Sequence, residues 1–207
     1  MKEFDSKLRS AELHLAKSDK VMSDLIDKLG PCTLFPSKDY FSSIVESIIG
    51  QQLSAKAADT IYSRFILLAG DCVPDSILKL HGEAFRKAGI SRQKEVYIKE
   101  FSAMITEHPD YFNQFEKLDD DDLLKKLTSV KGVGTWTAHM FLIFNMGRLD
   151  VLPLSDAGFR RSFNELYNGN GERLDDLKIL SVSNKWKPFR SIGAWYLWKY
   201  IDSKPHP

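Results

Sequence analysis

The sequence predicts an all-α fold, and three observations support this. Apolar residues recur at helical spacing along most of the chain, whereas sustained alternation of apolar and polar residues between turn signals is almost absent. Hydrophobic residues make up 43% of the chain and charged residues 28%, which is typical of a folded soluble protein. At 207 residues, the chain is long enough for one sizeable core or for two small lobes that share one.

The longest predicted helix covers residues 4–28, and the Gly30-Pro31 pair ends it. The residues expected on its apolar face are Leu8, Leu15, Met22, Leu25 and Leu29. Helices at 40–50 and 53–69 follow, and Ser54 suits the N-cap of the second. Further helices are expected at 74–80, 82–88, 91–107, 109–116, 119–126, 135–146, 157–167, 172–181 and 187–203.

The composition limits the partners and the location of the protein. The formal net charge is only +1, so any surface that attracts nucleic acid must be local. Cys32 and Cys72 are too few for an iron–sulfur cluster, which needs four ligands, and they favour a reduced cytoplasmic protein. The charged N-terminus is not a signal peptide, and no apolar run approaches the ~20 residues of a membrane helix. We therefore expect no membrane association, and a cytoplasmic location, or a nuclear one in a eukaryote.

The stretch from residue 127 to residue 161 is the most informative part of the sequence. Within it, Gly132 and Gly134 flank one apolar residue between two predicted helices, which allows a tight turn and a close backbone approach. The N–H groups that begin the second helix are unpaired, and such groups suit a phosphate oxygen. The pattern predicts a site that grips a DNA backbone without reading its sequence. An ordinary helix connection with a glycine cap fits these residues equally well.

Four segments, spanning about residues 40 to 200, resemble the helix-hairpin-helix DNA glycosylase superfamily. Residues 132–138 (GVGTWTA) resemble its hairpin. Residues 150–156 (DVLPLSD) resemble the loop that follows, whose last acid is the catalytic aspartate of that family. Residues 48–58 (IIGQQLSAKAA) are similar to its early helix pair. Residues 186–191 (WKPFRS), running on to Trp198, resemble the C-terminal helix of the 3-methyladenine DNA glycosylase II branch.

The resemblance implies a two-lobed helical fold with its active site in the cleft between the lobes. One lobe is expected at roughly residues 36–120, and the other at residues 1–35 together with 121–207. It implies a monomeric enzyme of base excision repair that flips alkylated purines, such as 3-methyladenine and 7-methylguanine, out of double-stranded DNA and hydrolyses their N-glycosidic bond. Asp156 is then the catalytic carboxylate. From local sequence alone, Asp156 is better interpreted as the N-cap of the 157–167 helix.

Two departures from the family pattern narrow the branch. Members that also cleave the DNA strand carry a lysine two residues after the second hairpin glycine, where this chain has Trp136. Without an amine at that position no Schiff base forms there, so we expect no lyase activity. Members with an iron–sulfur cluster have four C-terminal cysteines, which this chain lacks. Both departures favour the branch that acts on alkylated bases.

The resemblance also assigns substrate and DNA contacts. Trp136, Trp198 and Phe41 are expected at the flipped base, because an electron-poor cationic base stacks well on aromatic faces. Core packing is the alternative for each aromatic side chain except Trp136, which follows the hairpin directly. Gln52, or its neighbour Leu53, is expected to fill the gap that the base leaves. The residues expected to contact DNA are Gln52, Leu53, Ser54, Lys131, Gly132, Val133, Gly134, Thr135 and Arg161.

Some roles stay open at this point. Arg161, like Arg160 and Arg190, suits either a phosphate contact or a structural contact that holds the catalytic loop. The resemblance implies a sodium or potassium ion at hairpin carbonyls, here those of Thr128, Val130 and Val133, and no other cofactor. The alternatives are a glycosylase for deaminated or oxidised purines, a non-catalytic helix-hairpin-helix DNA-binding module, and a helical scaffold without a nucleic-acid role. Asp156 argues against the non-catalytic module.

Overall fold

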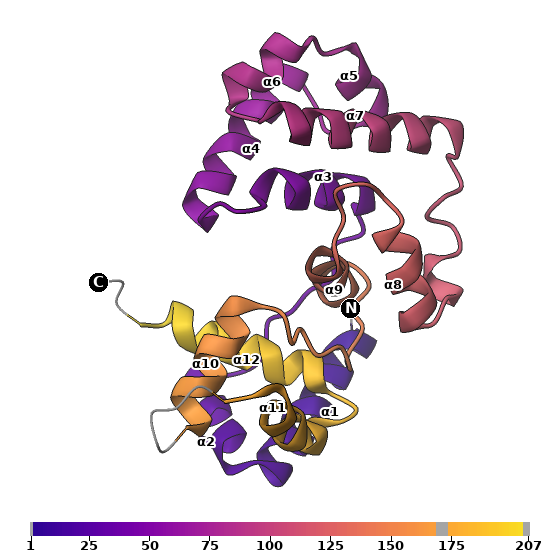
Figure 1. Ribbon diagram of the computed structural model, residues 1–207. Coiled ribbons are helices and arrows are strands. Elements are labelled where there is room, and N and C mark those ends of the chain that lie inside the picture. Colours follow the sequence, from indigo (N-terminus) through magenta and orange to yellow (C-terminus); the bar gives the residue numbers. More distant parts are fainter. Residues whose placement is uncertain (1, 169–173, 205–207) are drawn as a thin grey trace. The chain divides into compact units, whose positions relative to one another are not determined.

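In the computed structural model, which describes residues 2–168 and 174–204, every regular element is helical, as the sequence predicts (Figure 1). The helices form two compact units. The terminal unit falls within residues 1–36 and 147–207, and the central unit falls within residues 37–146. Two lobes are therefore present as expected, but residues 121–146 group with residues 37–120 and not with the chain termini.

Hydrogen bonds between the two ends of the central unit explain this boundary. The side-chain amide of Asn145 donates to Ser43 Oγ at 2.7 Å and to the carbonyl of Ser37 at 3.2 Å. The backbone N–H of Ser37 donates to the carbonyl of Phe144 at 2.9 Å. The two side-chain bonds connect residues that are separated by 102 and 108 positions in the sequence, so they tie the beginning of the central unit to its end.

The terminal unit begins with two helices where the sequence predicts one. Asp19 is the N-cap of the second, and its Oδ1 accepts the backbone N–H of Val21 at 2.9 Å. Its other carboxylate oxygen accepts hydrogen bonds from the Tyr167 hydroxyl and the Trp186 indole, both at 2.9 Å. The predicted helix over residues 4–28 is therefore wrong at this position, because a buried capping carboxylate interrupts it.

The elements of the terminal unit are α1 (Lys2–Ser18), α2 (Lys20–Leu29), α10 (Ala157–Tyr167), α11 (Asp176–Ser183), η2 (Asn184–Trp186) and α12 (Arg190–Asp202). The apolar face predicted across α1 and α2 is confirmed for four of its residues, since Leu8, Leu15, Met22 and Leu25 are buried. Burying each such side chain contributes about 1.5–3 kcal/mol. The helix predicted at 172–181 begins at Asp176, and residues 172 and 173 lie outside the described residues.

The central unit contains a longer series of helices. Its elements are α3 (Tyr40–Gly50), α4 (Ala55–Ala69), α5 (Pro74–Lys79), α6 (Gly82–Ala88), α7 (Arg92–Glu107), η1 (Phe115–Lys117), α8 (Asp120–Thr128) and α9 (Thr135–Phe144). Side-chain oxygens of Asp39, Ser54, Ser91 and Asp119 cap four of these helices. The helix predicted at 109–116 is instead a series of turns that leads into η1.

Candidate functional site

The glycine turn predicted around residue 132 joins α8 to α9. The backbone N–H of Val133 donates to the carbonyl of Val130 at 3.0 Å, which closes the turn. Gly132 has φ +85°, and a Cβ built there would lie 2.5 Å from Cδ2 of Tyr97 on α7. Both the backbone conformation and the lack of space therefore require glycine. The tight turn and the close approach that the sequence predicts are confirmed.

The hairpin exposes its polar groups and buries its apolar ones. Val130 and Val133 are buried, whereas Lys131, Gly134 and Thr135 are exposed. Gly134 is the N-cap of α9 and has no side chain to bond the first N–H groups of that helix. These N–H groups lie at the positive end of the helix dipole, where an anion is stabilised. Lys131 is paired with Glu100 at 3.1 Å on the surface, an arrangement that costs little to exchange for a phosphate.

The turn between α3 and α4 carries the glutamine pair. Gln52 is exposed and has φ +60°, in the left-handed region that non-glycine residues rarely adopt. Leu53 is 40% exposed, and Ser54 Oγ accepts the backbone N–H of Ala57 at 3.3 Å as the N-cap of α4. Gln52, the second residue of the pair, is thus at the surface and is held in a strained backbone conformation.

The hairpin and this turn lie beside each other within the central unit. The side-chain amide of Gln51 donates to the carbonyl of Gly132 at 2.6 Å. A groove of about 620 Å³ runs between them, and the first turns of α7 complete its wall with Ser91, Gln93, Lys94 and Tyr97. Sequence reasoning missed this contribution of α7. No motif or spacing in residues 91–97 indicates it, because the contacts are made to residues about 40 positions away.

Asp156 stands at the end of the loop that follows α9. It is the N-cap of α10, and its Oδ1 accepts the backbone N–H of Phe159 at 2.6 Å. The indole N–H of Trp198, on α12, donates to the same oxygen at 2.7 Å. Asp156 is half-buried. The capping interpretation of this residue is therefore correct, and the cap holds a carboxylate in one fixed orientation.

The space around this carboxylate depends on a glycine. A Cβ built at Gly158 would lie 3.3 Å from Asp156 Oδ1 and 3.4 Å from Cδ1 of Trp198. Both distances are at the short limit of van der Waals contact. The absence of a Cβ at Gly158 thus leaves room beside both the Asp156 carboxylate and the Trp198 indole.

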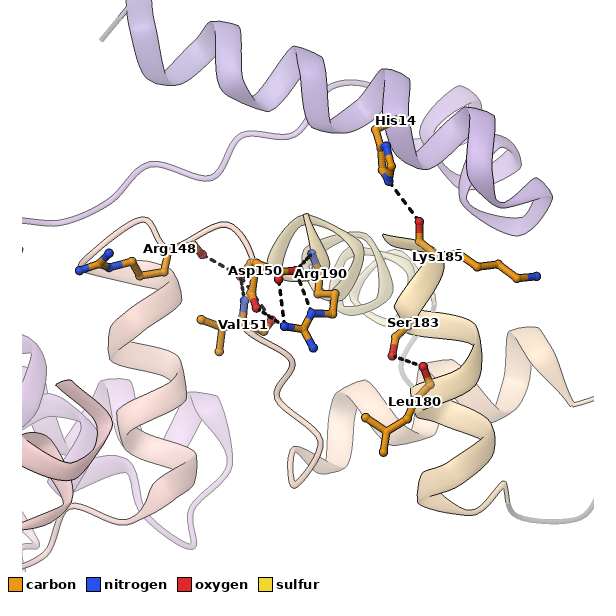
Figure 2. A network of polar contacts seen from close by, with 9 residues as sticks. His14, Arg148, Asp150, Val151, Leu180, Ser183, Lys185 and Arg190 are labelled. Carbon is orange, nitrogen blue, oxygen red and sulfur yellow. Dashed lines mark hydrogen bonds and ion pairs between the residues drawn. The ribbon is translucent and has the colours of Figure 1, made fainter. Parts of the chain in front are cut away.

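The loop that ends at Asp156 is held by hydrogen bonds near its start and near its end. Near its start, the Arg190 guanidinium bonds both carboxylate oxygens of Asp150, at 2.8 and 3.0 Å (Figure 2). Ser191 Oγ donates to the carbonyl of Arg148 at 2.7 Å and accepts the N–H of Val151 at 2.9 Å. A bidentate arginine–carboxylate pair is geometrically specific. Two residues at the start of α12 therefore position the beginning of the loop.

A second arginine holds the end of this loop, and it is Arg160 and not Arg161. Arg160 donates to the carbonyl of Leu154 at 3.1 Å and pairs with Asp176 at 2.6 Å. Arg161 is exposed and bonds Glu165 on its own helix at 3.4 Å. Of the two roles considered for Arg161, holding the loop is excluded by these contacts, and a phosphate contact stays a prediction.

The predicted aromatic residues fall into different environments. Trp136 is 40% exposed in the first turn of α9, as a stacking surface requires. Trp198 is half-buried and its N–H is bonded to Asp156. The prediction that Phe41 contacts the flipped base is wrong. Phe41 is 8% exposed and stacks on Phe101, with ring centroids 5.2 Å apart, in the core of the central unit. The sequence gives no signal that separates a core phenylalanine from an accessible one.

Comparison with known proteins assigns the family. Residues 45–188, which include the hairpin and Asp156, match the sequence model of the HhH-GPD superfamily of base excision DNA repair proteins. The chain belongs to the HhH-GPD superfamily. Among its HhH-GPD relatives, an alkylbase DNA glycosidase-like protein of Schizosaccharomyces pombe is 32% identical over 94% of both chains. DNA-3-methyladenine glycosylase 1 of the same yeast is 31% identical over 95% of this chain and 89% of its own.

Solved structures agree with this assignment. The 3-methyladenine DNA glycosylase of S. pombe, in complex with abasic DNA, superposes on this HhH-GPD chain with a TM-score of 0.82 at 28% identity, covering 96% of this chain and 99% of that one. A DNA-3-methyladenine glycosidase of Bacillus halodurans gives a TM-score of 0.77 at 36% identity, with coverages of 92% and 88%. Among the described residues, no helix has the length and apolar character needed to cross a membrane.

Proposed function

We propose that this chain is a monofunctional DNA glycosylase that removes alkylated purines, such as 3-methyladenine and 7-methylguanine, from double-stranded DNA. The proposal depends on one observation: Trp198 and the backbone of α10 hold the single carboxylate of Asp156 in one orientation. It lies within the family match, and the relatives are named as glycosylases for 3-methyladenine and alkylated bases.

One carboxylate is sufficient for this chemistry. As the N-glycosidic bond breaks, positive charge develops on the sugar, and a nearby carboxylate stabilises that charge and orients or deprotonates water. Glycoside hydrolases usually need a second carboxylic acid to protonate the leaving group. A purine alkylated at N3 or N7 is already cationic, so it leaves without that proton. Asp156 therefore supplies what the reaction requires, and the loop bonds keep it from turning away.

The surfaces of the central unit suit a duplex with one base extruded. The N–H groups at the start of α9, which no capping side chain bonds, bind a phosphate next to the lesion. Gln52 and Leu53, exposed on the neighbouring turn, fill the gap in the base stack. Flipping a base costs a few kcal/mol, less for a damaged pair, and the cationic base recovers energy by stacking on Trp136.

The product of this reaction is an abasic site in an intact strand. Trp136 occupies the position where a strand-cleaving relative would carry its lysine, so no amine stands there to form a Schiff base. This absence of lyase activity is part of the proposal. It separates the chain from bifunctional enzymes of similar architecture.

A monovalent cation fits the hairpin carbonyls. The carbonyl of Val130 accepts one N–H, from Val133, and keeps a second lone pair for an ion. Thr128 ends α8, where the helix dipole presents its negative end. With the carbonyl of Val133, these oxygens would hold sodium or potassium, whose charge would add to the attraction of the hairpin for phosphate.

The test is incubation of the purified protein with methylated duplex DNA, followed by chromatography of the released bases and electrophoresis of the strand. We expect free 3-methyladenine or 7-methylguanine and an intact strand. Prompt nicking without added base or heat would contradict the monofunctional assignment. Release of hypoxanthine or an oxidised purine alone would assign the enzyme to another lesion, and binding without release would indicate a non-catalytic module.

A further inference from the structure

The ammonium group of Lys94 lies at the end of α3. Lys94 Nζ donates to the carbonyl of Ile49 at 2.7 Å and to the carbonyl of Gln51 at 2.7 Å. The last carbonyls of a helix lack partners within it and form the negative end of its dipole. A half-buried lysine that bonds two of them from another helix therefore fixes the point at which α3 ends.

Gln51 extends this contact to the hairpin. Its carbonyl accepts from Lys94, and its own side-chain amide donates to the carbonyl of Gly132 at 2.6 Å. Tyr97, one turn after Lys94 on α7, packs against Gly132 so closely that a Cβ there would lie 2.5 Å from its ring. One stretch of α7 thus contacts both the α3–α4 turn and the hairpin, and Gln51 connects the two.

Gln52 follows directly after these anchored residues. Its φ of +60° places a non-glycine residue in the left-handed region, which costs of order 1 kcal/mol and persists only where neighbouring contacts enforce it. Lys94 and Gln51 supply those contacts on the residue before it. The result is a side chain that is exposed although its backbone is held rigidly.

We infer that Lys94 is a positioning residue for base flipping, which holds the exposed Gln52–Leu53 turn in fixed register with the phosphate-binding hairpin. The inference rests on the proposed function, because it assigns that turn as the wedge. In this role Lys94 does not touch the DNA. The wedge and the hairpin then act on the same duplex as one rigid unit, so that binding a phosphate places the wedge opposite the lesion.

The test compares Lys94→Met with a matched control, Lys99→Met. Lys99 lies on the same helix and donates its ammonium to the carbonyl of Leu80, at the end of α5, at 2.9 Å. Both changes remove an ammonium–carbonyl contact at a helix end, but only Lys94 faces the groove. Base release is measured in single-turnover reactions on methylated duplex and methylated single strands, beside the fluorescence of 2-aminopurine at the target position of an unmethylated duplex.

For Lys94→Met we expect duplex excision to fall by about tenfold to a hundredfold and the 2-aminopurine signal to fall with it. Single-strand excision should stay within about twofold of the wild type, since no base must be flipped there. Lys99→Met should match the wild type in all three. Equal losses for the two variants, or equal losses on duplex and single strands, would overturn the inference.

Salt dependence separates positioning from a direct phosphate contact. A lysine that binds phosphate lowers the slope of log affinity against log salt by about one when it is removed. We expect the slope for abasic duplex to be the same for Lys94→Met and the wild type, and a lower slope would overturn the positioning role. If Lys94→Met fails to fold, Gln51→Met serves in its place, because it keeps nearly the size of the side chain, adds no charge and cannot donate to Gly132.

The outcome also distinguishes this inference from the proposed function. A wild-type protein that releases no base but raises 2-aminopurine fluorescence contradicts the glycosylase assignment, and the fluorescence of the variants still tests Lys94. A wild-type protein that excises normally, with Lys94→Met equal to it on duplex DNA, leaves the glycosylase intact and removes the positioning role. A wild-type protein that binds no duplex contradicts both.

Discussion

The indole N–H of Trp198 donates a hydrogen bond to Oδ1 of Asp156 at 2.7 Å. The backbone N–H of Phe159 donates to the same oxygen, so α10 and α12, which pack against each other (Figure 1), both hold one carboxylate. The resemblance assigned Trp198 to the flipped base, whereas its polar edge belongs to the proposed catalytic group. Since α12 also bonds the start of the loop through Arg190, a single helix positions both ends of the catalytic segment.

Asp156→Asn tests the charge of the carboxylate without removing the cap. Asparagine is as good an N-cap as aspartate, so the fold and the binding of abasic DNA should be retained. Excision should fall by at least about a hundredfold, because a neutral amide does not stabilise the positive sugar. Single-turnover release of methylated bases and titration with fluorescent abasic DNA measure the two properties. Excision near the wild-type rate would remove Asp156 from the reaction.

Trp198→Phe keeps an aromatic ring but removes the hydrogen bond to Asp156. A hydrogen bond to a charged group is worth about 1.5–3 kcal/mol, so its loss should reduce excision by about tenfold to a hundredfold. Trp195→Phe, on the same helix and half-buried like Trp198, is the control and should retain activity. If Trp198 served only to stack on the base, phenylalanine would replace it and the rate would hardly change.

Gly158→Ala should separate stability from activity. Alanine is favoured over glycine within a helix by about 0.5–1 kcal/mol, so the thermal midpoint should stay the same or rise. The added Cβ would press on Asp156 and Trp198 from 3.3 and 3.4 Å, so excision should fall several-fold. Calorimetry and base release measure the two effects. If the thermal midpoint and the excision rate fell together, the added Cβ would destabilise the fold as a whole and not only the site.

Trp136→Ala tests the stacking surface of the hairpin helix. Because Trp136 is 40% exposed, its truncation should cost less stability than the 3–5 kcal/mol typical of a buried tryptophan. Excision should fall more steeply than stability, since the flipped base loses its aromatic contact. Trp186→Ala is the comparison, because Trp186 is fully buried and its loss should unfold the terminal unit. Urea titration and base release give both quantities, and the reverse order of effects would mark Trp136 as a core residue.

Local patterns predicted the parts of the site that are local in the chain. The hairpin, the capping carboxylate and most helix bounds follow from glycine spacing, N-cap residues and periodicity. What the sequence did not predict depends on distant partners. The break at Asp19 interrupts no periodicity, and besides its local cap it depends on Tyr167 and Trp186, which bond the second oxygen of its carboxylate. The burial of Phe41 depends in the same way on Phe101, sixty residues later.

Adjacent residues on a helix show the same limit on a smaller scale. Arg160 and Arg161 differ by about 100° around the axis of α10, so one reaches the loop and the other faces solvent. Periodicity alone does not say which direction the loop takes. Lys94 is a further case, because its acceptors, Ile49 and Gln51, lie 45 and 43 residues away.

His139 should make stability depend on pH. Its Nδ1 is buried without a hydrogen-bond partner among the described residues, and burial lowers the pKa of the imidazole below its ordinary value of 6.5. The unfolded chain therefore binds the proton at a higher pH than the folded one. Above about pH 6.5 the imidazole is neutral in both states and costs no stability. As the pH falls below about 6.5, toward the lowered pKa of the folded state, protonation favours the unfolded chain and the free energy of unfolding falls. His139→Gln should weaken this dependence, because glutamine does not titrate.

Urea titrations at about pH 7.5 and about pH 5.5 give the difference in the free energy of unfolding, with His108→Gln, at an exposed position, as the control. An unchanged difference in His139→Gln would assign the acid sensitivity to other groups.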